Sequence, residues 1–230
     1  MQVVILAGGL GTRIRSITKG KIPKVMLPIG NKPFLWYVLD YFRLQGIKDV
    51  ILCVGFGKEM IKDYFKNGQK YGLNIIYSEE KIPLGTGGAI KNAAFFIKNN
   101  KFILANGDTL FKLNLKELIF FHDMHKAKVS MALKFLLNTS RYGTVEVSQN
   151  HEVTKFIEKG NTKPGYVNGG IYVINKEILR DINKFPCSFE KDILPQFVKR
   201  GLYGKVFEDY FMDIGIPDDY EKAKREIESF

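Results

Sequence analysis

The chain has 230 residues, 45% of them apolar and 13% aromatic, so it can bury a sizeable core and is not a disordered segment. No run of about 18 apolar residues occurs, which argues against a transmembrane helix. The net charge of +11 would suit a nucleic acid partner, but the lysines are spread along the whole chain and no zinc-finger or RNP-type motif is present. Cys53 and Cys187 are too few for a disulfide framework and fit a reducing compartment. We therefore expect a cytoplasmic globular protein without nucleic acid or membrane partners.

The first 110 residues alternate short apolar runs with helical patterns. Residues 3–6 are wholly apolar, as expected of a buried parallel strand. Asn31 precedes the first helical pattern and is expected to cap it. The strands expected in this half are 3–6, 50–54, 73–77 and 101–105, and the helices are 34–44, 58–65 and 89–97. This alternation predicts an α/β fold with a mainly parallel, Rossmann-like sheet and helices on both faces.

The second half has more strands and fewer helices. The expected strands are 129–135, 143–147, 153–157 and 170–174, and the expected helices are 115–125 and 218–227. This order predicts an antiparallel extension beside the parallel sheet. Because no internal repeat and no Pro-, Gly- or Ser-rich linker interrupts the chain, we treat residues 1–230 as one domain.

A glycine-rich loop follows the first predicted strand and reads Ala-Gly-Gly-Leu-Gly-Thr-Arg at residues 7–13. Glycines let the backbone approach a ligand and turn several N–H groups toward it, and Arg13 adds a fork of donors suited to phosphate. A Walker A loop would need Gly-Lys where Thr12-Arg13 stands, and the dinucleotide pattern would need a third glycine at Ile14. The position at the carboxyl end of a parallel strand therefore predicts a phosphate site of another type.

This loop resembles the signature of the sugar-1-phosphate nucleotidyltransferases, which is Leu-Ala-Gly-Gly-x-Gly-Thr-Arg followed by Pro-Lys and Lys-Pro pairs. Here these segments are residues 6–13, 23–24 and 32–33, and the family's common proline after the first pair is replaced by Val25. The later markers follow in order at residues 84–88, 106–108, 142–143, 158–159, 168–170 and 212–215. The resemblance covers essentially the whole chain. It implies the nucleotide-diphospho-sugar transferase fold, with residues 1–110 binding the nucleotide and residues 111–230 the sugar phosphate.

The resemblance also implies roles for individual residues. Arg13, Lys24 and Asp108 would be catalytic, with Lys24 reaching the triphosphate or the transition state. The nucleotide would be held by Leu6, Ala7, Gly8, Gly9, Gly11, Thr12, Arg13, Lys24, Glu80, Gly85, Thr86, Asn106 and Gly107. The sugar phosphate would be held by Gly143, Glu158, Lys159, Asn168 and Gly169, with Lys159 on the phosphate and Glu158 and Asn168 on hydroxyl groups.

Two aspartates are candidates for a metal site. Asp108 ends the fourth predicted strand, and Asp213 follows more than a hundred residues later. Mg²⁺ is commonly held by a few carboxylates together with phosphate oxygens and water. The family's metal-binding aspartates align with Asp108 and Asp213, so Mg²⁺ is the expected cofactor.

Glu80 is the residue most informative about the base, because the uridylyl and thymidylyl members of the family typically carry Gln there. An ionised carboxylate only accepts hydrogen bonds, and guanine offers two adjacent donors. Glu80 therefore favours GTP, although Glu79 next to it could be mistaken for the same role and some short uridylyl members also carry Glu.

The function expected is the transfer of a nucleoside monophosphate from GTP to a sugar 1-phosphate, with release of pyrophosphate. In length and over residues 78–93 the chain most resembles guanylyltransferases that act on D-glycero-α-D-manno-heptose 1-phosphate, whose products feed capsule and surface glycans. Mannose 1-phosphate with GTP, an amino-sugar 1-phosphate with UTP, and a non-catalytic nucleotide-sugar sensor are the alternatives. No second, acetyltransferase activity is expected, and the sequence leaves the oligomeric state open, a homodimer included.

Overall fold

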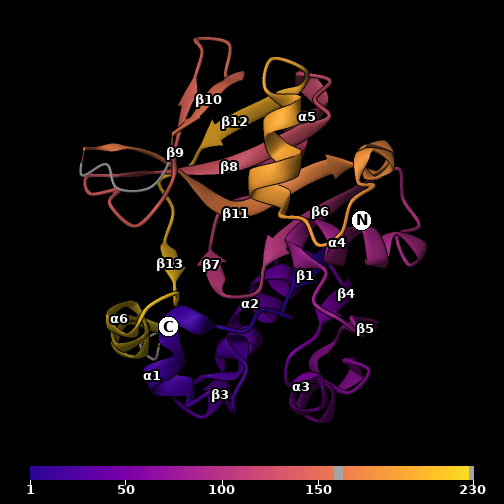
Figure 1. Cartoon of the computed structure of the whole chain (residues 1–230), viewed down its shortest axis with the longest axis vertical. Helices are drawn as coiled ribbons and strands as arrows, with labels where there is room; N and C mark the ends of the chain where they lie inside the picture. Colours follow the sequence, from indigo (N-terminus) through magenta and orange to yellow (C-terminus); the bar gives the residue numbers. More distant parts are fainter. Residues whose placement is uncertain (158–162, 228–230) are drawn as a thin grey trace.

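One sheet of nine strands runs through residues 1–157 and 163–227, the part of the chain that this computed structural model describes (Figure 1). The strands are β1 (Gln2–Leu6), β4 (Asp49–Val54), β5 (Asn74–Glu79), β6 (Lys101–Asn106), β8 (Val129–Leu136), β9 (Thr144–Val147), β10 (Val153–Ile157), β11 (Gly165–Asn175) and β12 (Leu202–Val206). Seven of them lie in the order β10-β9-β11-β6-β1-β4-β5. Strand β8 also pairs with β11, and β12 pairs with β8.

The sheet has a parallel half and an antiparallel extension, which confirms the predicted fold class. Strand β1 pairs in parallel with both β4 and β6, and β4 pairs in parallel with β5. The direction changes at β11, which pairs antiparallel with β6, β8 and β9. The carboxyl ends of the four parallel strands therefore share one edge, where α/β folds bind their ligands.

The parallel strands are buried on both faces, which explains their unbroken apolar sequences. Val3 and Ile5 point into one core, and Val4 points into the other. The first core is covered by the helices α2 (Phe34–Leu44), α3 (Lys58–Phe65), α5 (Leu115–Met124) and α6 (Pro217–Ile227). The second core is covered by α4 (Gly85–Asn92) and the short helical segments 176–181, 189–193 and 194–197.

A two-stranded ribbon beside the main sheet joins distant parts of the chain. It pairs β7 (Thr109–Phe111) antiparallel with β13 (Phe211–Asp213). Figure 1 shows it between the antiparallel strands and the helices α6 and α1 (Arg15–Thr18). Since Asp213 is in register with Thr109, the ribbon brings Asp213 beside the turn that carries Asp108.

The structure corrects several predicted boundaries. Asn31 does not cap α2, because the chain forms a small hairpin of β2 (Pro28–Ile29) and β3 (Lys32–Pro33) there and the helix begins directly after Pro33. Helix α4 begins at Gly85 rather than residue 89, and a short 3-10 turn replaces its predicted end. Strand β11 begins at Gly165, and β7, β12 and β13 were not predicted. The new strands are short or lack clear alternation, so tertiary pairing rather than local pattern defines them.

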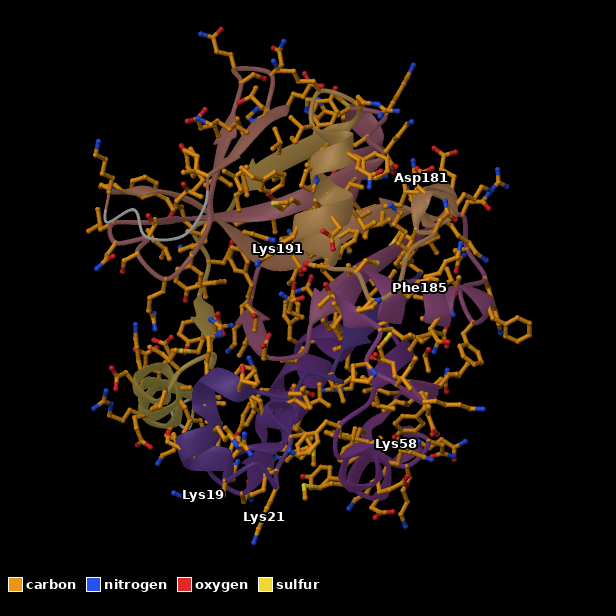
Figure 2. All side chains as sticks on the ribbon, viewed as in Figure 1. Lys19, Lys21, Lys58, Asp181, Phe185 and Lys191 are labelled. Carbon is orange, nitrogen blue, oxygen red and sulfur yellow. The ribbon has the colours of Figure 1, made fainter. Side chains whose placement is uncertain are left out.

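The lysines labelled in Figure 2 lie on different parts of the fold. Figure 2 shows Lys19 and Lys21 at one end of the molecule and Lys58 and Lys191 on other elements. Within the described residues, no helix is both long enough and apolar enough to cross a membrane.

Candidate active site

A cavity of about 800 Å³ opens at the carboxyl edge of the parallel strands. This volume suits a nucleotide-sized ligand. Its wall takes residues from the loops after β1, β4, β5 and β6, from the start of α4, and from residue 190 far along the chain. The lining residues are Leu6, Ala7, Gly8, Gly9, Leu10, Lys24, Val25, Cys53, Gly55, Phe56, Lys58, Glu80, Lys81, Ile82, Pro83, Gly85, Thr86, Ala89, Asn106, Asp108 and Glu190.

The glycine loop forms one wall of this cavity, and its first glycine is required by packing. A Cβ atom on Gly8 would lie 2.9 Å from Oε1 of Glu80 and 3.0 Å from the backbone nitrogen of Gly55. Gly11 has a left-handed φ of 59° and starts the 3-10 turn Thr12–Ile14. The residues predicted to bind phosphate at the end of this loop, Gly11, Thr12 and Arg13, do not line the cavity. The charge of Arg13 nevertheless lowers the pKa of Asp213 relative to the effect of burial alone.

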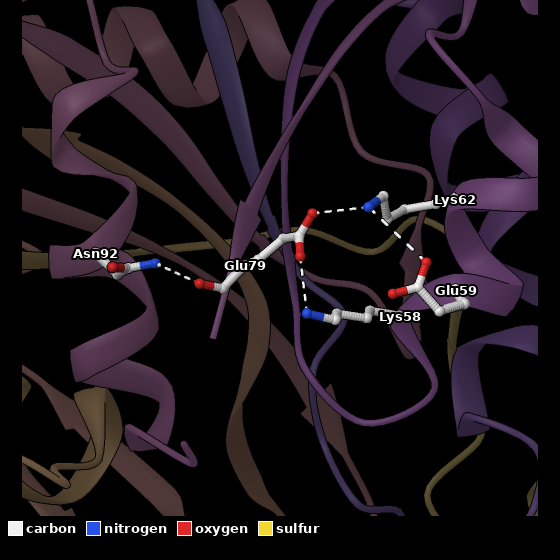
Figure 3. Close-up of polar contacts among 5 residues, drawn as sticks. All are labelled: Lys58, Glu59, Lys62, Glu79 and Asn92. Carbon is white, nitrogen blue, oxygen red and sulfur yellow. Dashed lines mark hydrogen bonds and ion pairs between the residues drawn. The ribbon is translucent and has the colours of Figure 1, made fainter. Parts of the chain in front are cut away.

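The two adjacent glutamates after β5 have different surroundings. Oε2 of Glu80 accepts a hydrogen bond from the backbone N–H of Leu84 at 2.9 Å, and burial raises the pKa of Glu80 inside the cavity wall. Glu79 instead bonds Lys58 and Lys62, each at 2.8 Å, and these bonds lower its pKa to about 2 (Figure 3). Glu79 is therefore committed to surface ion pairs, and Glu80 is the carboxylate available to a ligand.

Asp108 lies in the turn between β6 and β7 and forms an ion pair with Lys24. The pair is largely buried, with 12% of the Lys24 side chain and 27% of the Asp108 side chain exposed. Burial alone raises the pKa of Asp108, but the Lys24 ammonium outweighs that effect and holds the pKa below its ordinary range. A cation and a carboxylate therefore meet at the floor of the cavity.

Asp213 lies next to this ion pair without a full set of partners of its own. The backbone N–H of Ile214 donates to the carbonyl oxygen of Asp108 at 3.1 Å, which fixes the two segments together. Oδ1 of Asp213 is buried, and no donor among the described residues reaches it. Burial and the nearby Asp108 carboxylate raise the pKa of Asp213 to about 6. The carboxylates of Asp108 and Asp213 thus face the same small region, and one of them has an oxygen that lacks a partner.

The unpartnered carboxylate leads to a stability prediction. Because the folded-state pKa of Asp213 lies above its ordinary value, the folded protein holds this proton more tightly than the unfolded chain. Stability is then lost as the pH rises from about 4 to about 6. Asp213→Asn does not titrate, so it should stabilise the metal-free protein near neutral pH by about 1–3 kcal/mol, while its advantage should shrink near pH 4. Urea denaturation with a chelator at both pH values measures this, and a variant no more stable than wild type near pH 7 would contradict it.

The start of α4 is built around the backbone of Cys187. The N–H of Gly87 donates to the carbonyl oxygen of Cys187, and the N–H of Cys187 donates to that of Leu84, each at 3.0 Å. A Cβ atom on Gly85 would lie 2.3 Å from the carbonyl oxygen of Cys187, and Gly85 has a φ of 73°. These contacts explain why a glycine-rich segment of low helix propensity nevertheless begins a helix here.

Gly85→Ala is expected to destabilise the protein by about 3 kcal/mol or more, because it combines a left-handed backbone with a clash against backbone atoms. Gly46→Ala is the matched control, since Gly46 also has a positive φ, 83°, but has open space around its Cβ position. It should cost only about 1 kcal/mol. Chemical denaturation of both variants measures the free energy of unfolding. Equal losses of stability in the two variants would show that the Cys187 contact is unimportant.

Three of the predicted sugar-phosphate residues, Gly143, Asn168 and Gly169, are described by the structure, and they lie outside the lining of the cavity. Asn168 is on β11, where its Nδ2 donates to the hydroxyl of Tyr172 at 2.5 Å and its Oδ1 accepts from the N–H of Gly170 at 3.0 Å. Gly169 permits close packing, because a Cβ there would lie 2.6 Å from the ring of Phe111. Gly143 precedes β9. Glu158 and Lys159 lie outside the described residues. Gly107, which was predicted to bind the nucleotide, donates its N–H to the carbonyl oxygen of Leu6.

Several lining residues were missed by the sequence analysis. Gly55, Phe56 and Lys58 follow β4, so the rule that ligands bind at the carboxyl ends of parallel strands could have found them. Ile82 lies in the loop after Glu80, and it could have been found in the same way. Glu190 could not, because no motif near it points to this cavity.

Known proteins are similar to this chain over nearly its full length. The nucleotidyl transferase family model matches residues 2–229. The D-glycero-alpha-D-manno-heptose 1-phosphate guanylyltransferase of Campylobacter jejuni is 47% identical over 223 residues, which covers 96% of this chain and 97% of that protein. The enzyme of the same name from Aneurinibacillus thermoaerophilus is 44% identical over 238 residues, with 100% of both chains covered. A mannose-1-phosphate guanyltransferase of Saccharomyces cerevisiae is 33% identical over 96% of this chain, but over 63% of its own length.

Two solved structures share the fold. HddC from Yersinia pseudotuberculosis, complexed with GMP-PN, superposes with a TM-score of 0.87 at 38% identity and covers 98% of this chain and 99% of its own. The structure of a protein from Bacillus anthracis described as a putative glucose-1-phosphate thymidylyltransferase also has a TM-score of 0.87, covers 98% of this chain and 94% of its own, and is 21% identical. On the match of the family model and the full-length similarity, this chain belongs to the nucleotidyl transferase family.

Proposed function

We propose that the protein is a guanylyltransferase that joins GTP and D-glycero-α-D-manno-heptose 1-phosphate into a GDP-heptose with release of pyrophosphate. The observation that carries this proposal is the cavity itself, where a glycine loop, the Lys24–Asp108 pair and Glu80 line one nucleotide-sized space. Full-length similarity to two proteins named as heptose 1-phosphate guanylyltransferases supports the choice of substrates.

The reaction needs no side-chain nucleophile. An oxygen of the sugar phosphate attacks the α-phosphorus of GTP, the bond from that phosphorus to the bridging oxygen breaks, and pyrophosphate leaves with the electron pair. The loop residues 7–10 would bind phosphate oxygens through their N–H groups, and Lys24 would place its ammonium where negative charge develops. Catalysis would then come from holding the two anions in line and neutralising their charge.

The residues present fit a divalent cation. Asp213 has a buried oxygen without a partner, and Asp108 lies beside it. Within the described residues no third carboxylate, histidine or cysteine completes a cluster. The remaining ligands would therefore be phosphate oxygens and water, which is the usual environment of Mg²⁺ in phosphate chemistry. We propose Mg²⁺ between Asp108 and Asp213, where its charge would offset the repulsion between the two phosphates.

The remaining parts of the proposal concern place and purpose. GTP and sugar phosphates are cytoplasmic metabolites, and the two buried free thiols suit a reducing compartment. We therefore place the reaction in the cytoplasm. Its product would supply the synthesis of capsule or surface glycans, in which nucleotide-activated sugars are the donors.

Glu80 provides a test of base selection. We propose that its carboxylate accepts hydrogen bonds from the guanine edge, which uracil can match less well. Glu80→Gln keeps the size of the side chain and adds a donor, so it should lower kcat/KM for GTP about tenfold or more and narrow the preference for GTP over UTP. Glu79→Gln is the matched control, because the Glu79 side chain accepts hydrogen bonds from Lys58 and Lys62 and does not line the cavity. An unchanged ratio of GTP to UTP in the Glu80 variant would remove Glu80 from base recognition.

The whole proposal is tested by a matrix of the four nucleoside triphosphates against several sugar 1-phosphates, with pyrophosphate release as the readout. GTP with heptose 1-phosphate should give the highest kcat/KM. A higher kcat/KM with mannose 1-phosphate would show that the assigned sugar is wrong, and a higher kcat/KM with UTP would show that the assigned base is wrong. Binding of the substrates without turnover for every pair would identify a non-catalytic sensor and refute the proposal that the protein is an enzyme.

A further inference from the structure

Glu190 is a carboxylate in the cavity wall that neither phosphate binding nor the metal pair explains. It lies in the segment Phe189–Ile193, is half-buried, and lines the same cavity as Lys24 and Asp108. A carboxylate repels phosphate, so a site for two phosphorylated substrates has no use for Glu190 near their phosphates. A ligand group that binds next to Glu190 would therefore have to donate hydrogen bonds and carry no negative charge.

The side chain of Glu190 is held in one orientation by its neighbours. Its Oε2 accepts hydrogen bonds from the hydroxyls of Thr86 at 2.8 Å and Ser188 at 3.1 Å. The Thr86 hydroxyl in turn accepts from the N–H of Phe189 at 2.7 Å, which commits its proton to Glu190. Both donors bind the same oxygen. In the part of the chain that the structure describes, Oε1 receives no such bond, so it is available to a ligand.

The position of Glu190 relates it to the predicted sugar site. Its segment packs against the buried ring of Tyr172, whose centroid lies 5.3 Å from that of Phe189. Burial and the Glu190 carboxylate raise the pKa of Tyr172, and the hydroxyl of Tyr172 is bonded to Asn168. Asn168 is one of the two residues expected to contact sugar hydroxyls, together with Glu158. Glu190 thus lies between the start of α4 and the strand that carries Asn168.

We propose that Glu190 is a specificity-determining residue that accepts hydrogen bonds from hydroxyl groups of the sugar 1-phosphate. This inference rests on the proposed function, because it assumes a sugar phosphate in the cavity. An ionised carboxylate only accepts hydrogen bonds, and a hydroxyl can donate, so a neutral polyol is the matching ligand. The ribose of the nucleotide offers the same chemistry. The proximity of Tyr172 and Asn168 favours the sugar, and the experiment separates the two sources.

The test compares steady-state kinetics of wild type and Glu190→Gln. This variant keeps the shape of the side chain and one acceptor oxygen but removes the charge. Hydrogen bonds to charged groups are the stronger ones, so KM for the sugar 1-phosphate should rise about tenfold to a hundredfold, while KM for GTP stays within about twofold. Asp192→Asn is the matched control, because Asp192 is an exposed carboxylate of the same segment that accepts a hydrogen bond from the Ser188 backbone N–H and does not line the cavity. It should leave both KM values unchanged.

Deoxy substrates distinguish a direct contact from a structural role. With monodeoxy analogues of the sugar 1-phosphate, the one that lacks the contacted hydroxyl should give the same KM in wild type and Glu190→Gln. Loss of discrimination against 2′-deoxy- or 3′-deoxy-GTP would instead assign Glu190 to the ribose and overturn the inference. Equal rises in both KM values together with a lower melting temperature would also overturn it, as a purely structural role.

Wild-type turnover in the same assay reports on the proposed function separately. If wild type turns over the sugar 1-phosphate and Glu190→Gln has an unchanged KM for it, only the inference about Glu190 fails. If wild type turns over no sugar 1-phosphate with any nucleotide, the proposed function fails and the inference with it.

Discussion

Asp108→Ala is expected to lower kcat/KM by about a thousandfold or more. The variant removes one of the two carboxylates that face the proposed Mg²⁺ position, and the charge stabilisation by a metal ion at a phosphoryl centre contributes several kcal/mol to the barrier. It also leaves Lys24 without its ion-pair partner. The measurement is the rate of pyrophosphate release over a range of GTP and sugar 1-phosphate concentrations, which gives kcat/KM.

Asp218→Ala is the control for Asp108→Ala, because Asp218 is an exposed aspartate in the first turn of α6, a few residues beyond Asp213. It should retain near wild-type activity. Turnover of the Asp108 variant within about tenfold of wild type would show that the carboxylate pair is not the catalytic centre.

Lys24→Met is expected to have the second largest effect, with kcat lowered about a hundredfold to a thousandfold. Lys24 is the positive side chain at the floor of the cavity, and a fixed cation placed where charge develops contributes an effect of this size. The variant should also destabilise the metal-free protein by about 1–3 kcal/mol, since the Lys24 ammonium no longer offsets the repulsion between the carboxylates of Asp108 and Asp213.

The two effects of Lys24→Met can be measured independently. Mn²⁺ alone should raise the melting temperature of this variant more than that of wild type, because it replaces the lost positive charge. Lys21→Met, an exposed lysine of the same loop outside the cavity lining, should change neither activity nor stability. A Lys24 variant with wild-type kcat and no extra response to Mn²⁺ would refute both roles.

The parallel half of the fold could be predicted from the sequence because its signals are local. Residues 3–6 are apolar at every position, and a strand of that kind is buried on both faces wherever it occurs. The glycine loop follows it directly, so the edge of the sheet that carries the cavity could be predicted as well. Asp108 could be placed there for the same reason, since it follows the end of β6.

The elements and site residues that could not be predicted from the sequence depend on contacts between distant segments. The pairing of β7 with β13 involves three residues on each side, too few for a periodic pattern, yet it brings Asp213 to Asp108. Helix α4 begins in a run of glycines because the backbone of Cys187 packs against it. Glu190 follows Cys187 closely in the chain and is hydrogen-bonded to Thr86, 104 residues earlier. No local sequence pattern predicts a contact over that separation.

Diffraction from crystals grown with Mn²⁺, a non-hydrolysable GTP analogue and the sugar 1-phosphate would test the central claim most directly. The anomalous signal of Mn²⁺ should lie between the carboxylates of Asp108 and Asp213 and contact a phosphate oxygen, with the triphosphate along the glycine loop and the guanine edge on Glu80. An ion bound to the phosphates alone and remote from both aspartates, or a nucleotide outside this cavity, would contradict the account.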